Sequence, residues 1–212
     1  MQAARGTPVD DRGDGPDETR SPLLAAPRTW LLFASVGATM LVVDQVAKVL
    51  AVRHLADGPD VEVVGELLQL HLTYNPGAAF SLGTRFTVAL SVLATVATIV
   101  VLWLSRRLRS AWWAVALGLM FAGITGNLAD RLFREPGPLR GHVVDFLMLP
   151  NWPVFNVADV CINVGVVMIL VQVLRGIGLD GTKVDPKQAA EQAPTAPTTA
   201  PTTAPTTAED DA

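Results

Sequence analysis

The sequence has few of the residues that build disulfides, metal sites or a highly charged surface. A single cysteine, Cys161, excludes an intramolecular disulfide and a cysteine-based zinc site. Only 17% of the 212 residues are charged, whereas soluble domains have about 25%. The net charge of −4 argues against nucleic acid as a partner. There is no G-x-S-x-G motif, no P-loop and no G-x-G-x-x-G motif followed by a helical segment, so serine hydrolase, NTPase and dinucleotide-binding functions lack support.

Four long apolar runs dominate the rest of the chain, at about 30–52, 86–105, 111–130 and 154–174. A helix needs about 20 apolar residues to cross about 30 Å of hydrocarbon. The alternative, a soluble four-helix bundle, would show a polar stripe on each helix, and the second run shows none. We therefore predict an all-α membrane protein with four transmembrane helices. Tryptophan favours the membrane interface, and all five tryptophans fall at run ends: Trp30, Trp103, Trp112, Trp113 and Trp152.

The arginines predict how the four helices are oriented. The short connection between the second and third runs contains Arg106, Arg107 and Arg109, and such loops face the cytoplasm. With four spans, both termini would then be cytoplasmic. The outer loops also carry arginines, so the difference in positive charge between the two sides of the membrane is only partial. The first run is longer than the core of a signal peptide and lacks an A-x-A cleavage site, so we expect it to be retained as a span.

The segments outside the four runs differ in character. We expect a disordered N-terminal extension at 1–28, a four-span core at 29–175, and a disordered Thr/Pro/Ala-rich tail at 176–212. In the outer loop at 53–85, residues 61–66 and 68–74 alternate in part between apolar and polar, which predicts a small extracytoplasmic β-sheet. The proline-rich connection at 134–153 predicts an irregular loop at the membrane interface.

Ionisable side chains occur in or beside three of the four runs, although a charge in mid-bilayer costs about 2.5–3.5 kcal/mol. Asp44 and Lys48 are four residues apart, so they share a helix face and can pair. Asn127, Asp130 and Arg131 share a face in the third run. These groups can be interpreted as links between helices, with Asp44–Lys48 and Asp130–Arg131 as structural ion pairs.

Asp145 and Asp159 fit that interpretation less well, because neither has a cation beside it in the sequence. Asp159 forms a polar stripe with Asn156 and Asn163, and it is expected about five residues inside the fourth span. Two close carboxylates share a proton, so one can act as a base and the other as an acid, as in aspartic peptide hydrolysis. A proton- or ion-coupled transporter, which also uses intramembrane carboxylates, and a non-catalytic membrane scaffold stay open as alternatives.

Five blocks of sequence, in order along the four-span core, resemble the lipoprotein signal peptidase family, also called signal peptidase II. They are Asp44-Gln45-Val46-Ala47-Lys48 (D-Q-x-x-K), Asn75-Pro76-Gly77-Ala78-Ala79-Phe80 (N-x-G-A-A-F), Gly126-Asn127-Leu128-Ala129-Asp130-Arg131 (G-N-x-x-D-R), Val143-Val144-Asp145-Phe146 (V-V-D-F) and Phe155-Asn156-Val157-Ala158-Asp159 (F-N-x-A-D).

The resemblance implies a bacterial plasma-membrane aspartic endopeptidase that cleaves prolipoproteins before a diacylglyceryl-modified cysteine. It implies an active site at the extracytoplasmic face, contact with membrane lipids, inhibition by globomycin-type compounds, and no metal or other cofactor. We also expect a monomer. The implied catalytic residues are Asp145 and Asp159. The residues that the resemblance assigns to binding or support of the site are Asp44, Lys48, Asn75, Gly77, Asn127, Asp130, Arg131 and Asn156.

Overall fold

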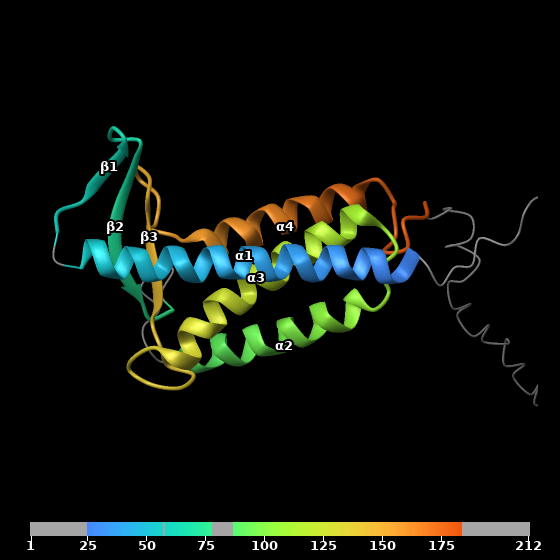
Figure 1. Cartoon of the computed structure of the whole chain (residues 1–212), viewed down its shortest axis with the longest axis horizontal. Helices are drawn as coiled ribbons and strands as arrows, with labels where there is room; N and C mark the ends of the chain where they lie inside the picture. The colour runs from blue at the N-terminus through green and yellow to red at the C-terminus, as the bar shows by residue number, and fades with distance from the viewer. Residues whose placement is uncertain (1–24, 57, 78–86, 184–212) are drawn as a thin grey trace, which may run out of the picture.

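The computed structural model describes residues 25–56, 58–77 and 87–183. Both expected disordered ends lie largely outside these residues, as does part of the outer loop. Figure 1 shows the helices lying side by side and a small sheet at one end of the bundle. The elements are α1 (Ala25–Leu55), β1 (Val61–Val64), β2 (Leu68–Asn75), α2 (Thr87–Ser105), α3 (Ala111–Phe133), β3 (Val143–Met148) and α4 (Val157–Leu174).

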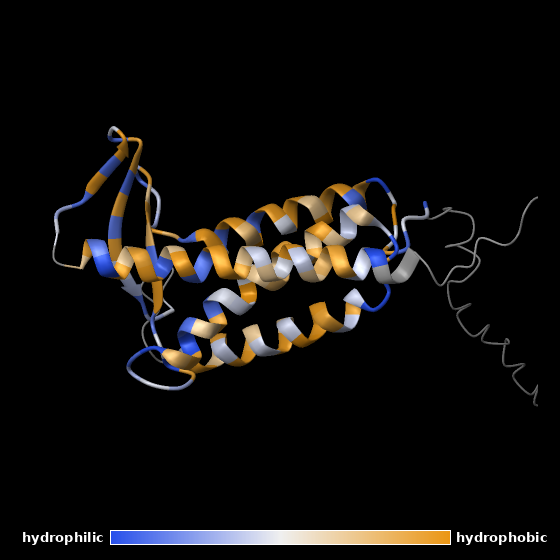
Figure 2. Ribbon diagram, viewed as in Figure 1, coloured by the Kyte–Doolittle hydropathy of each residue, from blue (hydrophilic) through white to orange (hydrophobic). Residues whose placement is uncertain are grey.

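The four predicted spans are confirmed. Each of the four helices is long and apolar enough to cross a membrane, and Figure 2 shows that apolar residues predominate along them. Many large apolar side chains on their surfaces are exposed, among them Val46, Leu93 and Val167. Lipid is the environment that such side chains require. The chain is therefore a multi-pass membrane protein.

Helix α3 lies at the centre of the bundle and packs against α1, α2 and α4. Glycines of α3 permit the close approach. A Cβ on Gly123 would lie 2.4 Å from the backbone oxygen of Ala158 in α4. A Cβ on Gly126 would lie 2.6 Å from Asp44 Oδ2 in α1. A larger residue at Gly123 would push against the backbone of α4, and one at Gly126 would force either the Asp44 side chain or the packing of α1 on α3 to shift.

The sheet is antiparallel, in the order β1-β2-β3. Strands β1 and β2 confirm the prediction from alternation. Strand β3 shows that the prediction of an irregular loop for all of 134–153 was wrong. The sequence of β3, Val-Val-Asp-Phe-Leu-Met, does not alternate, because Val143–Phe146 are all buried. A strand buried on both faces has no period-two pattern to recognise.

The chain between β3 and α4 also differs from the prediction. Phe155 pairs with Leu147, accepting and donating backbone hydrogen bonds beside β3. Helix α4 begins only at Val157, and Asn156 is its N-cap. Asp159 therefore lies in the first helical turn, rather than about five residues inside the span as expected.

The opposite end of the bundle carries the short α2–α3 connection and the segment that follows α4. The Nε1–H of Trp113 donates to the backbone oxygen of Ile177 at 3.2 Å. The backbone N–H of Arg109 donates to the backbone oxygen of Leu179 at 3.2 Å. Residues 176–183, at the start of the expected tail, thus fold back against the α2–α3 connection. Trp113 is buried rather than placed at the surface.

Candidate active site

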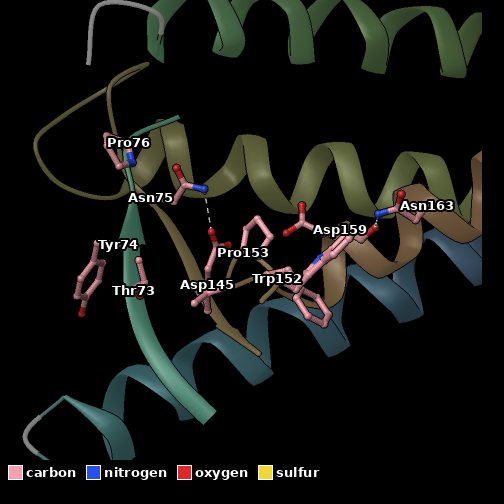
Figure 3. A pocket seen from close by; sticks show the side chains of 11 residues that line it. Thr73, Tyr74, Asn75, Pro76, Asp145, Trp152, Pro153, Asp159 and Asn163 are labelled. Atoms are coloured by element: carbon pink, nitrogen blue, oxygen red, sulfur yellow. Dashed lines mark hydrogen bonds between the residues drawn. The ribbon is translucent and has the colours of Figure 1, made fainter. Parts of the chain in front are cut away.

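The sheet end of the bundle contains a cavity of about 440 Å³ between the end of β2, β3 and the start of α4. Asp145 and Asp159 both line it, together with Asn75, Trp152 and Asn163. Figure 3 shows that the Asp145 and Asp159 side chains come from different elements, β3 and α4, and both line this cavity. The two aspartates singled out by the sequence are thus brought to one site.

Asp145 is held on β3 by two side-chain amides. Its Oδ2 accepts a hydrogen bond from Asn75 Nδ2 at 2.9 Å, and its Oδ1 accepts one from Asn156 Nδ2 at 2.6 Å. Burial raises the pKa of Asp145 to about 6, the Asn75 bond opposes that rise, and the charge of Asp159 adds to it. Asp145 is therefore a carboxyl group that keeps its proton more readily than an exposed one.

Asn75 reaches Asp145 from a tight turn at the end of β2. The backbone N–H of Gly77 donates to Asn75 Oδ1 at 2.9 Å, which leaves Nδ2 directed at Asp145. Gly77 has φ of +110°, and a Cβ there would lie 2.8 Å from Leu90 Cδ1 of α2. The positive φ is what requires glycine here, and a Cβ would in addition displace the Leu90 side chain. The rest of the N-x-G-A-A-F block, residues 78–80, lies outside the described residues.

Asp159 belongs to a capping box at the start of α4. Its Oδ2 accepts from the backbone N–H of Asn156 at 3.1 Å, and its own backbone N–H donates to Asn156 Oδ1 at 3.0 Å. Its Oδ1 accepts from Asn127 Nδ2 at 2.8 Å. Both carboxylate oxygens of Asp159 are therefore held by N–H donors at the N-terminal end of α4.

Asn127 links this pair to α1. Its Oδ1 accepts from Lys48 Nζ at 3.0 Å and from Asn156 Nδ2 at 3.1 Å. Because two donors meet its oxygen, its Nδ2 must face Asp159. The amides of Asn127 and Asn156 therefore join the two aspartates in one hydrogen-bond network.

Beneath the network lies a buried cluster of charges. Lys48 is fully buried, and its Nζ lies 3.0 Å from Asp44 Oδ2 and 2.8 Å from Asp130 Oδ2. Asp44 also accepts from the backbone N–H of Ala158 at 2.8 Å. Asp130 Oδ2 also accepts a hydrogen bond from the backbone N–H of Val144 at 3.3 Å. The cluster thus joins α1 and α3 to the segments that carry the two aspartates, and the predicted Asp44–Lys48 pair is confirmed.

The predicted Asp130–Arg131 pair was wrong. Asp130 pairs with Lys48 and with Arg134, whose Nε lies 2.5 Å from Asp130 Oδ1. Consecutive residues on a helix do not face each other, whereas residues four apart do. Arg131 Nη1 donates to the backbone oxygen of Asn127 at 3.3 Å, and its Nε has no partner among the described residues.

Two residues of this site were missed at the sequence level. Arg134 is four residues after Asp130, a spacing that could have identified it. Gln45 donates to Asp44 Oδ2 at 3.0 Å and to the backbone oxygen of Gly126 at 3.1 Å, so it belongs to the support of the buried cluster. Its place in the D-Q-x-x-K block was the available signal.

Comparison with known proteins identifies the family. The family model described as signal peptidase (SPase) II matches residues 36–175. The chain is 45% identical over 178 residues to a lipoprotein signal peptidase of Mycobacterium avium strain 104, covering 84% of this chain and 97% of that one. It is 46% identical over 173 residues to one of Mycolicibacterium smegmatis, covering 82% of this chain and 73% of the relative.

The fold has a solved counterpart as well. A bacterial membrane enzyme, determined by the in meso method at 1.9 Å resolution, superposes with a TM-score of 0.60 at 26% identity, covering 68% of this chain and 92% of that one. The transporter and scaffold alternatives are thereby set aside. The chain belongs to the signal peptidase II family, the membrane aspartic proteases that remove signal peptides from prolipoproteins.

Proposed function

We propose that Asp145 and Asp159 are the catalytic pair with which this chain cleaves prolipoproteins before a diacylglyceryl-modified cysteine. The observation that carries the proposal is the network in which Asn156 donates to both carboxylates beside one cavity. Rigid positioning of two carboxylates is what aspartic proteolysis requires. Asp44, Lys48, Asn127 and Asp130 support the pair, and Asn75 orients Asp145.

The environments of the two carboxylates suggest their roles. Asp159, at the helix N-terminus, starts ionised and takes a proton from water as the water oxygen attacks the scissile carbonyl carbon. Asp145, whose pKa burial raises to about 6, is the carboxyl group that takes up a proton more readily, and in its protonated form it gives that proton to the carbonyl oxygen. In the second step the proton on Asp159 moves to the leaving nitrogen and the C–N bond breaks. Asp145 recovers a proton from the gem-diol.

The architecture suits a substrate anchored by acyl chains. Each CH₂ removed from lipid costs about 0.8 kcal/mol, so the protease must act at the membrane. A second groove, of about 290 Å³, runs between α2, α3 and α4 and is lined by apolar residues with Asn127 and Arg131. We assign this groove to apolar parts of the substrate. Arg131 adds a positive charge to the lining of this otherwise apolar groove.

We further propose that both termini are cytoplasmic and that the catalytic pair lies at the extracytoplasmic face. The α2–α3 connection with its arginines lies at the same end as the start of α1 and the end of α4, and the sheet lies at the other end (Figure 1). Arginine-rich short loops face the cytoplasm. The proposal includes a monomeric enzyme, inhibited by globomycin-type compounds, in a bacterial plasma membrane.

The test is cleavage of a synthetic prolipoprotein peptide with a diacylglyceryl-cysteine by the purified full chain in detergent. Wild type is compared with Asp145→Asn and Asp159→Asn, and the products are identified by mass spectrometry. We expect cleavage directly before the lipidated cysteine by wild type and none by either variant. The same peptide without the lipid should be cut far more slowly.

A matched control is Asp180→Asn, which changes an exposed aspartate at the opposite end of the bundle. It should cleave like wild type. Cleavage by either Asp145→Asn or Asp159→Asn at the wild-type rate would refute the assignment of the pair. Absence of cleavage by folded wild type would refute the proposed activity.

A further inference from the structure

Asn163 is a polar side chain on a surface that faces lipid. It lies in α4, and the neighbouring surface positions of that helix are exposed valines: Val160, Val164 and Val167. Asn163 is exposed as well. An amide facing hydrocarbon without a partner is costly. The position of Asn163 therefore suggests that its side chain contacts a ligand.

The position of Asn163 relative to the catalytic pair indicates which part of the substrate it would contact. Asn163 lines the same cavity as Asp145 and Asp159, and Figure 3 shows it along α4 on the far side of Asp159 from Asp145. It is four residues further along the helix than Asp159, about 6 Å deeper in the membrane at 1.5 Å per residue. The cavity therefore extends from the catalytic pair toward the lipid interior, with an amide at its deeper end.

The hydrogen-bonding capacity of Asn163 is only partly used. Its Nδ2 donates to the backbone oxygen of Asp159 at 2.9 Å, as the dashed line in Figure 3 shows. That bond fixes the side chain against the helix. Its Oδ1, which can accept two hydrogen bonds, has no protein donor among the described residues. The oxygen is therefore held in place and available to a ligand.

The substrate brings donors to this depth. A peptide bond must lie in an extended segment to reach both aspartates, so the residues just before it lose their helical hydrogen bonds. In the hydrocarbon region, unpaired backbone N–H groups cost several kcal/mol each. An extended chain advances about 3.3 Å per residue, so a depth of about 6 Å corresponds to about two residues on the signal-peptide side of the cleaved bond.

We propose that Asn163 is a positioning residue that accepts a hydrogen bond from a backbone N–H of the signal peptide, about two residues before the cleaved bond. This inference rests on the proposed function. Asn163 would hold the extended segment in register with the catalytic pair, independently of the substrate's side chains. Such a contact suits an enzyme that acts on many apolar signal sequences.

The experiment compares wild type, Asn163→Leu, Asn163→Gln and the control Val167→Leu, which changes an exposed residue of α4 outside the cavity. The substrates are the lipidated peptide and three versions of it. In each version an ester replaces one of the three amides that precede the scissile bond, which removes a single N–H. We measure kcat/KM, and the melting temperature of each variant in detergent.

Asn163→Leu should lower kcat/KM at least about tenfold, with a melting temperature equal to or above that of wild type, because the side chain is exposed. Val167→Leu should match wild type, and Asn163→Gln should retain part of the activity. One ester should slow wild type by about the same factor and slow Asn163→Leu no further. If Asn163 bonds that N–H directly, the ester slows wild type but not Asn163→Leu. If Asn163 has only a structural role, the ester slows both enzymes by the same factor.

Two results would overturn the inference while the catalytic pair stands: wild-type kcat/KM in Asn163→Leu, or equal sensitivity of wild type and Asn163→Leu to every ester. The proposed function is read out separately, by cleavage in wild type and its loss in Asp145→Asn and Asp159→Asn. If wild type does not cleave the lipidated peptide, both proposals fall together.

Discussion

Asn156 donates a hydrogen bond of 2.6 Å from its side-chain amide to Asp145 Oδ1. The same residue is the N-cap of α4 and donates its backbone N–H to Asp159 at 3.1 Å. One asparagine thus fixes both carboxylates. The start of a transmembrane helix and the position of a strand are set relative to each other by this residue.

Asn156→Ala should therefore lower both stability and activity. It leaves a buried oxygen of Asp145 without its amide donor, at about 1–3 kcal/mol, and removes the N-cap of α4, at about 0.5–2 kcal/mol. We expect a lower melting temperature and a cleavage rate reduced at least about tenfold. Thr98→Val, which removes a hydroxyl bonded within α2, is the control and should change neither. An unchanged rate in Asn156→Ala would contradict the positioning role.

Lys48→Met should destabilise the fold strongly. The change leaves Asp44 and Asp130 buried without their shared cation, and breaking a buried ion pair in this way costs about 3–5 kcal/mol. Adding Asp44→Asn to Lys48→Met should recover part of the loss, because one uncompensated charge is removed. Thermal unfolding in detergent measures both. Strictly additive losses would show that Asp44 and Lys48 are not energetically coupled.

Asp145→Asn should change how stability depends on pH. The pKa of Asp145 is raised from 3.8 to about 6 in the folded chain, so the folded state holds this proton more tightly than the unfolded state. Its contribution to stability is fully present below about pH 4 and is lost as pH rises through about 6. The loss is about 3 kcal/mol. Wild type should therefore lose stability relative to Asp145→Asn between pH 4 and pH 7.5.

The measurement is the difference in melting temperature between wild type and Asp145→Asn at those two pH values. Glu62→Gln supplies the control, because that carboxylate is exposed. A difference that stays the same at both values would mean that burial of Asp145 carries no cost in the folded protein.

Gly126→Ala should disturb the buried cluster. The added Cβ would lie 2.6 Å from Asp44 Oδ2, so either Asp44 or the packing of α1 on α3 must shift. We expect reduced activity and a melting temperature lowered by several degrees, since overpacking costs about 1–3 kcal/mol. Gly58→Ala, where a Cβ would meet only the His54 oxygen at 3.8 Å, should be neutral. Wild-type behaviour of Gly126→Ala would mean that α1 and α3 do not need this close approach.

The sequence predicts the parts of this structure that depend on local patterns. Apolar length is enough to predict four spans, and alternation is enough to predict β1 and β2. Spacing of four residues predicts the Asp44–Lys48 pair. It could not predict that Asp130 reaches Lys48 from another helix, because that contact depends on how α1 and α3 pack. The adjacency of Asp130 and Arg131 was misleading, since neighbours on a helix point in different directions.

Strand β3 shows a second kind of limit. Its partner is β2, about 70 residues earlier, and its own residues carry no alternation because they are buried. The register that sets Asp145 opposite Thr73 is a property of the assembled sheet. The two aspartates were found through their residue type and their resemblance to a family. The sequence places Asn156 beside Asp159 on one helix face, but its bond to Asp145 and the bond from Asn127 to Asp159 could be found only in three dimensions.

The most direct test of the central claim is whether Asp145 and Asp159 act as one unit. The measurement is the single-turnover cleavage rate of the lipidated peptide by Asp145→Asn, Asp159→Asn and the double variant. Residues that act together in one step show non-additive losses, so the double variant should be no slower than either single variant. The account would be contradicted if the fold reduction in rate of the double variant equalled the product of the two single reductions. A near wild-type rate in either single variant would contradict it as well.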